Sequence, residues 1–287
     1  MGNVTRIAPA LNEVPGNARD DVAETPASRS VTGLATSVEA VAAGFKFGTN
    51  GPHSSRTMMA DHLIHLLVRT PPEATLADYR RVIVDENLLN KKTESTRRET
   101  LRRLRELYAL TAGVPVFRVL REYWPHDPGG RPLLALLVAL ARDPLLRISA
   151  AVILNSQPGA KVRTAEFEAA LSRARPGHFG PKIQAATARN IASTWEQSGH
   201  LSGRLHKIRA AVQPTPWAVT LALFLAYCAG ERGEFLLASQ WLRLLDIPPG
   251  AVGTQIAAAH RLGLLNCFRS GSVVQVSFPN LLQTTRR

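Results

Sequence analysis

Two stretches in the second half of the chain show helices followed by a short alternating segment around a glycine. In the first stretch, Thr164 to Arg173 and Lys182 to Gln197 have helical periodicity. Residues 201–212 then alternate loosely around Ser202-Gly203, which is typical of a β-hairpin. Because helices followed by a hairpin are the order of a winged helix, we predict a winged-helix-like unit at residues 161–213.

The second stretch has the clearer pattern. Three helices are predicted, at Trp217 to Ala229, Phe235 to Leu245 and Ala251 to Leu262. A hairpin is predicted at residues 264–278, around Gly271, with Val274, Val276 and Phe278 on one face. Residues 214–287 are therefore predicted to form a C-terminal winged-helix-like domain. A small α/β domain without a nucleic-acid role has the same pattern, and winged helices also dock proteins.

A helix-turn-helix outline precedes these stretches. Leu76 to Leu89 is predicted to be an amphipathic helix, and residues 90–93 a short polar link. A second helix is predicted to begin at Thr96, whose spacing to Glu99 fits a capping box. The apolar stripe of this second helix consists of Leu101, Leu104 and Tyr108.

Residues 47–160 are predicted to form a helical domain that contains this helix-turn-helix. Its other predicted helices are Ser55 to Arg69, Val116 to Trp124, Arg131 to Ala141 and Leu145 to Asn155. Residues 1–46 lack a sustained period and are predicted to be a flexible N-terminal extension, in which residues 31–45 could form a short helix on contact with the body. The predicted fold class is mainly α, with helix-turn-helix and winged-helix-like units that carry short β-hairpins.

The net charge of +13 lies in the part of the chain that is predicted to fold. Residues 161–287 alone have a net charge of +9, and residues 91–105 contain seven basic and two acidic residues. Such an excess favours nucleic acid or another anionic surface as the partner. A solvated helix face with surplus arginines is the alternative interpretation of residues 91–105.

The residues that we expect to contact phosphates lie in the three predicted units. They are Lys91, Lys92, Arg97, Arg98, Arg102 and Arg105 in the basic helix, Lys182, Arg189, Arg204, Lys207 and Arg209 in the first winged unit, and Gln255, Arg261 and Arg269 in the second. Contacts to base edges are possible at Gln184, Asn190 or Gln255.

Three strings of residues carry a family resemblance. They are Asp85-Glu86-Asn87-Leu88-Leu89-Asn90-Lys91-Lys92 running into Thr96-Arg97-Arg98, then Arg142-Asp143-Pro144-Leu145-Leu146, and Trp195-Glu196-Gln197-Ser198-Gly199-His200-Leu201. With them, residues 47–245 resemble the BrxA-type family of bacteriophage-exclusion (BREX) defence loci. The resemblance implies a non-enzymatic, largely helical DNA-binding component of a phage-resistance system. The chain departs from the compact family pattern in its N-terminal extension and in the tail after about Asp246.

Motifs for catalysis are missing from the sequence. There is no Gly-x-x-x-x-Gly-Lys-[Ser/Thr] phosphate loop, and no serine or cysteine lies in a nucleophile motif. His62 and His65 have a spacing that can bind metal, but no third ligand is indicated. We therefore expect no enzyme activity, no metal site and no cofactor.

The expected location is the cytoplasm. Cys228 and Cys267 are isolated thiols that suit a reducing compartment, and no secretory signal is visible. The longest apolar stretches, at 133–141 and 217–229, are shorter than the ~20 residues that a membrane span needs.

The predicted function is duplex-DNA binding without catalysis. Aromatic residues are only 6% of the chain, which disfavours a stacking platform for single strands. Two alternatives use the same charges: an adaptor that docks acidic surfaces of partner proteins in a defence complex, and an RNA-binding helical protein.

Overall fold

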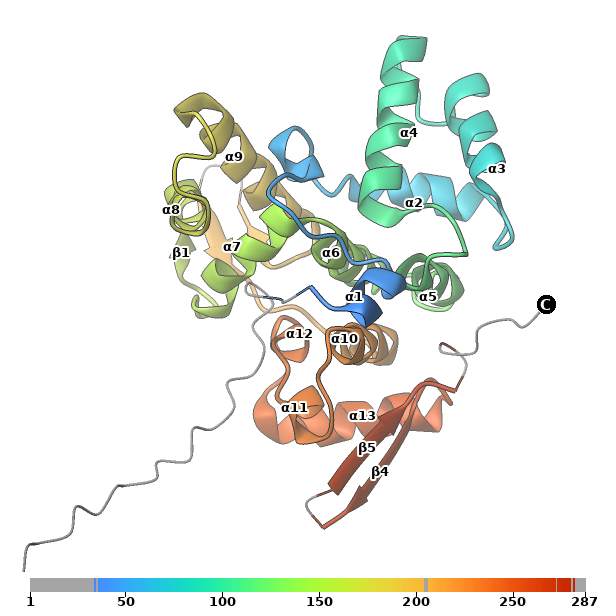
Figure 1. Ribbon diagram of the computed structural model, residues 1–287, viewed down its shortest axis with the longest axis vertical. Helices are drawn as coiled ribbons and strands as arrows, with labels where there is room; N and C mark the ends of the chain where they lie inside the picture. The colour runs from blue at the N-terminus through green and yellow to red at the C-terminus, as the bar shows by residue number, and fades with distance from the viewer. Residues whose placement is uncertain (1–33, 35, 204–205, 272, 280, 282–287) are drawn as a thin grey trace, which may run out of the picture.

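The computed structural model describes residues 34, 36–203, 206–271, 273–279 and 281, which are mainly helical with small antiparallel sheets (Figure 1). The first half contains α1 (Val38–Ala43), η1 (Pro52–Ser54), α2 (Ala60–Arg69), α3 (Leu76–Arg80), η2 (Arg81–Asp85), α4 (Glu94–Tyr108), α5 (Pro115–Tyr123), α6 (Arg131–Arg142) and α7 (Pro144–Leu154). The second half contains β1 (Lys161–Val162), α8 (Thr164–Ala174), α9 (Pro181–Gln197), β2 (Leu201–Ser202), β3 (Lys207–Arg209), α10 (Pro216–Cys228), α11 (Glu234–Leu237), α12 (Gln240–Arg243), η3 (Pro249–Ala251), α13 (Val252–Arg261), β4 (Asn266–Ser270) and β5 (Val273–Ser277).

The helices α6 and α10 form the centre of the molecule. Every residue from Leu133 to Arg142 in α6 and from Ala218 to Ala226 in α10 is buried. A helix that is apolar on all sides needs neighbours all round it. The buried apolar residues accordingly form one continuous core, which extends across the predicted boundaries at residues 161 and 214. None of the helices in the described ranges combines the length and the apolar character that a bilayer crossing requires.

The prediction of a flexible extension at residues 1–46 does not hold for residues 36–46. Ser37 caps α1 by accepting a hydrogen bond from the Ala40 N–H at 3.1 Å. Ala40, Ala43 and Phe45 are buried, and α1 lies against α5 and α10. Burial of these apolar side chains stabilises the short helix, as considered for residues 31–45. Residues 1–33 and 35 lie outside the described residues.

The first helix of the predicted helix-turn-helix is shorter than the sequence indicates. α3 passes into the π-helical turn η2, and helical hydrogen bonding ends before Leu89. Asn87 and Asn90 have positive φ angles of 53° and 50°, a conformation that asparagine tolerates better than most residues. The Asn87 side chain then closes the turn, because its Oδ1 accepts a hydrogen bond from the Lys91 N–H at 2.7 Å.

The second helix begins earlier than predicted. Thr93, and not Thr96, is the cap of α4, and its hydroxyl oxygen accepts a hydrogen bond from the Thr96 N–H at 3.2 Å. Leu104 and Tyr108 are buried as predicted, whereas Leu101 is partly exposed. α2 begins at Ala60, and not at Ser55, because residues 52–54 form a separate 3-10 turn. The bounds of α5, α6 and α7 lie within one residue of the prediction.

The residues of the first predicted winged unit form two helices and a three-stranded sheet. β1 pairs with β3, and β3 pairs with β2, so that the strand order is β1-β3-β2 and all pairs are antiparallel. Lys161 lies opposite Ile208, and Leu201 lies opposite Arg209. α8 packs against both α7 and α9. β1 is too short to show an alternating pattern in the sequence, and it was not predicted.

The C-terminal residues pack on α10. α13 contacts α10, and Val274, Val276 and Phe278 on the β4–β5 hairpin are buried as predicted. The predicted helix at residues 235–245 is instead two short helices, α11 and α12, joined at Ser239, whose side chain caps α12. Leu262, the last residue of the predicted third helix, directly follows α13 and is 55% exposed, so it does not contribute to this packing.

Candidate nucleic-acid interface

α9 presents an exposed stripe along one side. At 3.6 residues per turn, Lys182, Ala186, Arg189 and Ser193 fall on this side of the helix. Lys182 and Arg189 are exposed, and their side chains have no bonding partner among the described residues. Ala186, between them, and Ser193, one turn beyond Arg189, are small and partly buried. The stripe therefore presents two cations on a surface that a large anionic molecule can approach closely.

The opposite side of α9 faces the core. Thr187, Ile191 and Trp195 are buried there, as their spacing predicts, and the Trp195 indole N–H donates a hydrogen bond to the Ser149 Oγ at 2.8 Å. Ile183, in the first turn of α9, is 52% exposed. This packing fixes the rotation of α9 and hence the direction of the stripe.

A basic pocket of about 300 Å³ lies beside the first turn of α8, next to the β2–β3 connection. Its basic lining residues are Lys161, Arg163, His206 and Lys207. No acidic residue lines it, although the Lys207 Nζ lies 2.6 Å from the Glu196 carboxylate. Glu166, the acidic residue in the first turn of α8, accepts a hydrogen bond from the Arg163 N–H at 2.8 Å. Lys161, Arg163 and His206 were not predicted as site residues, because only the fold brings them together.

The third side of α9 is held by the segment before α2. The Asn190 Nδ2 donates to the His53 carbonyl at 3.0 Å, and the Gln197 Oε1 accepts from the Ala60 N–H at 3.0 Å. The Gln184 Nε2 donates to the Glu168 carbonyl at 3.0 Å. Gln184 and Asn190, which were considered as base-reading residues, therefore have structural partners within the protein.

His53, Asp143 and Thr194 form a buried chain of hydrogen bonds that resembles a nucleophile triad. The His53 Nδ1 lies 2.7 Å from the Asp143 carboxylate, and its Nε2 lies 2.7 Å from the Thr194 Oγ1. Burial alone would raise the pKa of Asp143, but the contacts with His53 lower it below its usual value. All three side chains are fully buried, so a substrate cannot reach them. These hydrogen bonds instead connect η1, α7 and α9.

The arginines of α4 are largely paired with acids on the same helix. Arg98 contacts Glu94 at 2.5 Å, and Arg102 contacts Glu99 at 2.7 Å and Glu106 at 2.9 Å. Arg103 contacts the same two glutamates. The hydrogen bonds from Arg102 lower the pKa of Glu99 to about 2. Much of the positive charge that the sequence places on this helix is therefore neutralised locally.

Other residues predicted for the basic helix also have partners. Arg97 donates a hydrogen bond to the Val84 carbonyl at 2.6 Å, and the Lys91 Nζ lies 2.5 Å from the His62 Nε2. Burial and the nearby Lys91 lower the pKa of His62. Lys92 and Arg105 are exposed, and neither side chain makes an ion pair within the described part of the chain.

Arg209, predicted as a phosphate contact, is instead a structural residue. Its side chain is 3% exposed, and its guanidinium binds the Asp246 carboxylate, with an Nη1–Oδ2 distance of 3.0 Å. Asp246 also accepts a hydrogen bond from the Val212 N–H at 2.9 Å. The pair therefore connects β3 to the chain after α12. Arg204, another predicted phosphate contact of the first winged unit, lies outside the described residues.

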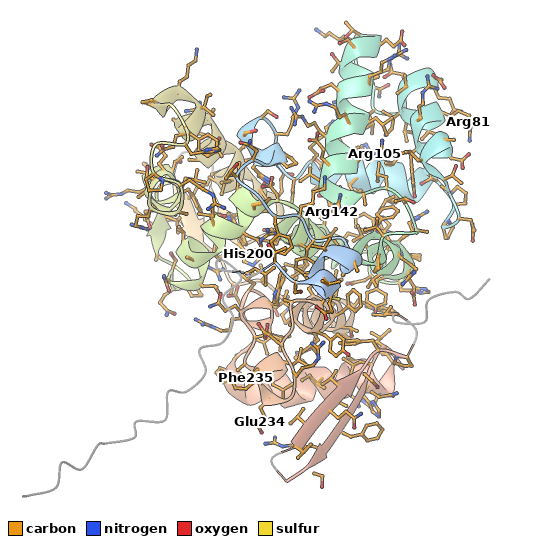
Figure 2. All side chains as sticks on the ribbon, viewed as in Figure 1. Arg81, Arg105, Arg142, His200, Glu234 and Phe235 are labelled. Atoms are coloured by element: carbon orange, nitrogen blue, oxygen red, sulfur yellow. The ribbon has the colours of Figure 1, made fainter. Side chains whose placement is uncertain are left out.

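The C-terminal candidates are dispersed. Gln255 is half-buried and lies on the other side of α13 from the exposed Thr254 and Ala257. Arg261 is exposed at the end of the helix, and Arg269 on β4 lies 3.2 Å from the Glu234 carboxylate. Figure 2 shows Glu234 and Phe235 beside this part of the molecule. Only Arg261 of the three offers an unpaired charge.

Within the described ranges, no group of three or more His, Cys, Asp or Glu side chains is arranged to hold a metal ion. His62 and His65 therefore gain no third ligand from the fold. The chain matches no family model, no curated protein and no solved structure.

Proposed function

We propose that the protein binds duplex DNA, without catalysis, through a winged-helix unit formed by residues 144–209. In this unit α9 is the recognition helix, and the paired strands β2 and β3 belong to the wing. The central observation in support is the order of the elements, α7, β1, α8, α9, β2 and β3, together with the strand order β1-β3-β2. The helix that precedes the hairpin, α9, has Lys182 and Arg189 on its solvent-exposed side.

The dimensions of DNA explain why the stripe suits a duplex. The major groove admits an α-helix, and side chains on that helix reach bases or phosphates only where its surface comes close. Ala186 keeps the α9 surface low between Lys182 and Arg189, and Ser193 does the same beyond Arg189. The basic pocket at the start of α8 would bind a phosphate of the flanking backbone.

The resemblance to the BrxA-type family supports a place for this activity in bacterial phage defence. We propose that the protein is a DNA-binding component of a BREX-type system in the cytoplasm. In such a system, sequence-independent binding through phosphates would hold the assembly on DNA.

A charge-reversal experiment tests this function. Fluorescence anisotropy with a labelled 20-base-pair duplex at low salt would compare the wild type with the double variant Lys182→Glu and Arg189→Glu. We expect the affinity of the variant to fall by more than about tenfold, because two phosphate contacts become repulsive. The matched control is Arg69→Glu with Arg243→Glu, two exposed and unpaired arginines away from α9.

Two outcomes would contradict the proposal. One is absence of binding by the wild type at low salt, and the other is an equal loss of affinity in the α9 variant and in the control. A duplex RNA of the same length, titrated in parallel, tests the RNA alternative, which requires tighter binding to RNA than to DNA.

A second candidate function is docking of an acidic partner protein. A groove of about 480 Å³ between α3 and α4 has an apolar floor that includes Leu76, Val84 and Leu101. Its rim consists of Arg80, Arg98, Arg102 and Arg105. A partner helix with alternating apolar and acidic residues would fit it. This candidate predicts that duplex DNA does not compete with the partner.

A further inference from the structure

A second basic pocket lies away from α9, where the end of α4 meets the end of α6. Its volume is about 410 Å³, and its polar lining consists of Lys46, Arg102, Arg105, Glu106, Thr111 and Arg142. Small apolar side chains complete the wall. In Figure 2, Arg105 and Arg142 are labelled one above the other, where α4 approaches the body of the molecule. The residues come from three separate segments, so only the fold brings these charges together.

The pocket has more positive charge than its one acid can balance. Glu106 is already engaged by Arg102 and Arg103, each at 2.9 Å. The side chains of Lys46, Arg105 and Arg142 make no ion pair with any residue that the structure describes. Burial and the neighbouring Arg142 lower the pKa of Lys46, and burial lowers the pKa of Arg142 to about 10. Burial is the largest cause of both pKa shifts, and the nearby Glu106 only partly offsets the shift of Lys46.

Arg142 is held in place. Its side chain is buried, its Nη1 donates to the Gly44 carbonyl at 2.7 Å, and its Nε donates to the Glu106 carbonyl at 3.1 Å. These carbonyls supply dipoles but not a full negative charge. An anion that entered the pocket would therefore meet a cation whose position is already fixed.

The chain beside the pocket has an unusual backbone. Ala109, which lines the pocket, and Leu110 have positive φ angles of 71° and 53°. Such angles are rare without glycine and persist only where the surrounding structure fixes them. Leu110 is fully buried, which anchors the turn. The wall of the pocket is therefore set by the core and does not depend on a bound ligand.

We propose that this pocket binds a phosphate group between Lys46, Arg105 and Arg142. A doubly charged phosphate supplies the missing counter-ion, and guanidinium and ammonium groups are its usual partners in proteins. The phosphate belongs either to a small free ligand or to the backbone of bound nucleic acid. The site does not include α9 or its neighbours, so the proposal does not depend on the function proposed above.

Isothermal titration calorimetry on the full chain tests the site. Inorganic phosphate and pyrophosphate are the probes, with sodium chloride at matched ionic strength as the blank. We expect saturable binding by the wild type and at least about tenfold weaker binding by Lys46→Ala with Arg105→Ala. The control is Arg69→Ala with Arg243→Ala, which removes two exposed charges elsewhere. Both pairs are exposed, and circular dichroism confirms that the variants fold.

The single variant Lys46→Glu separates binding from structure. Its carboxylate would lie beside Arg142 and act as the missing counter-ion. We expect it to abolish phosphate binding without lowering the melting temperature. If Lys46 has only a structural role, the melting temperature falls instead.

A titration of duplex DNA with Lys46→Ala combined with Arg105→Ala identifies the source of the phosphate. Unchanged duplex affinity, together with lost pyrophosphate binding, assigns the site to a small ligand. Duplex affinity and salt dependence that both decrease assign it to the nucleic-acid backbone. If Lys46→Ala with Arg105→Ala changes neither titration, the proposal is wrong.

Discussion

The helices α4 and α9 differ in how their basic residues are used. α4 has 15 residues and five arginines, but four of these bind Glu94, Glu99, Glu106 or the Val84 carbonyl. α9 has two basic residues on its exposed stripe, Lys182 and Arg189, and neither has a partner among the described residues. A count of basic residues therefore overstates the charge that α4 has available for an anion. Acids three or four positions away decide how much charge remains available.

The largest effect is expected on stability, when Arg209 is replaced. This variant tests whether a buried, paired arginine serves the fold and not an external anion. Arg209→Ala leaves the Asp246 carboxylate without its partner in a largely buried position. Breaking a buried pair in this way costs about 3–5 kcal/mol of the free energy of unfolding. Urea denaturation measures the loss. A variant as stable as the wild type would show that Arg209 is dispensable for folding and would return it to the candidate phosphate contacts.

A smaller and opposite effect is expected when the acids of α4 are neutralised. Glu99→Gln with Glu106→Gln frees Arg102 and Arg103 from their ion pairs. Duplex affinity should rise several-fold, and the salt dependence should steepen by about 0.9 for each arginine that gains a phosphate. Anisotropy titrations at three salt concentrations give both quantities. Unchanged affinity and slope would mean that α4 faces away from the DNA even when its arginines are free.

The smallest effect concerns pH. Because the pKa of Glu99 falls from 4.5 to about 2 on folding, its ion pairs stabilise the protein above pH 4.5. That contribution is lost as the pH falls from about 4.5 through about 2. For pairs this exposed it is worth less than about 1 kcal/mol. The stability difference between the wild type and Glu99→Gln should shrink below about half of its neutral value at pH 3. A difference that grows toward acid would contradict the pairing.

Much of the helical architecture could be predicted from periodicity. α5, α6 and α7 have sustained apolar patterns, and their predicted bounds differ from the observed ones by no more than one residue. The errors lie where local chemistry overrides the pattern. The apolar residues up to Leu89 predict a longer helix, but the chain leaves the helical conformation at Asn87. Thr93, and not Thr96, caps the next helix. The strand β1 has two residues, which is too few for any alternating signal.

The candidate site was less predictable than the fold. Lys182 and Arg189 were found because helical spacing distinguishes their side of α9 from the core side. Arg209 was misplaced, since its partner Asp246 is 37 positions away in the chain. Lys46 could not be predicted as a site residue for the same reason. It lies near Arg142 only because α1 and the residues that follow it pack on the rest of the protein. Charge pairing over long sequence distances is a property of the tertiary structure alone.

The salt dependence of duplex binding tests the contrast between α4 and α9 most directly. One 20-base-pair duplex is titrated with the wild type, with Lys182→Ala and Arg189→Ala combined, and with Arg98→Ala and Arg102→Ala combined. Each lost phosphate contact lowers the slope of log K against log salt by about 0.9. We predict a decrease of about 1.8 for the α9 variant and nearly none for the α4 variant. A larger decrease for the α4 variant, or an unchanged slope for the α9 variant, would contradict α9 as the DNA-binding helix.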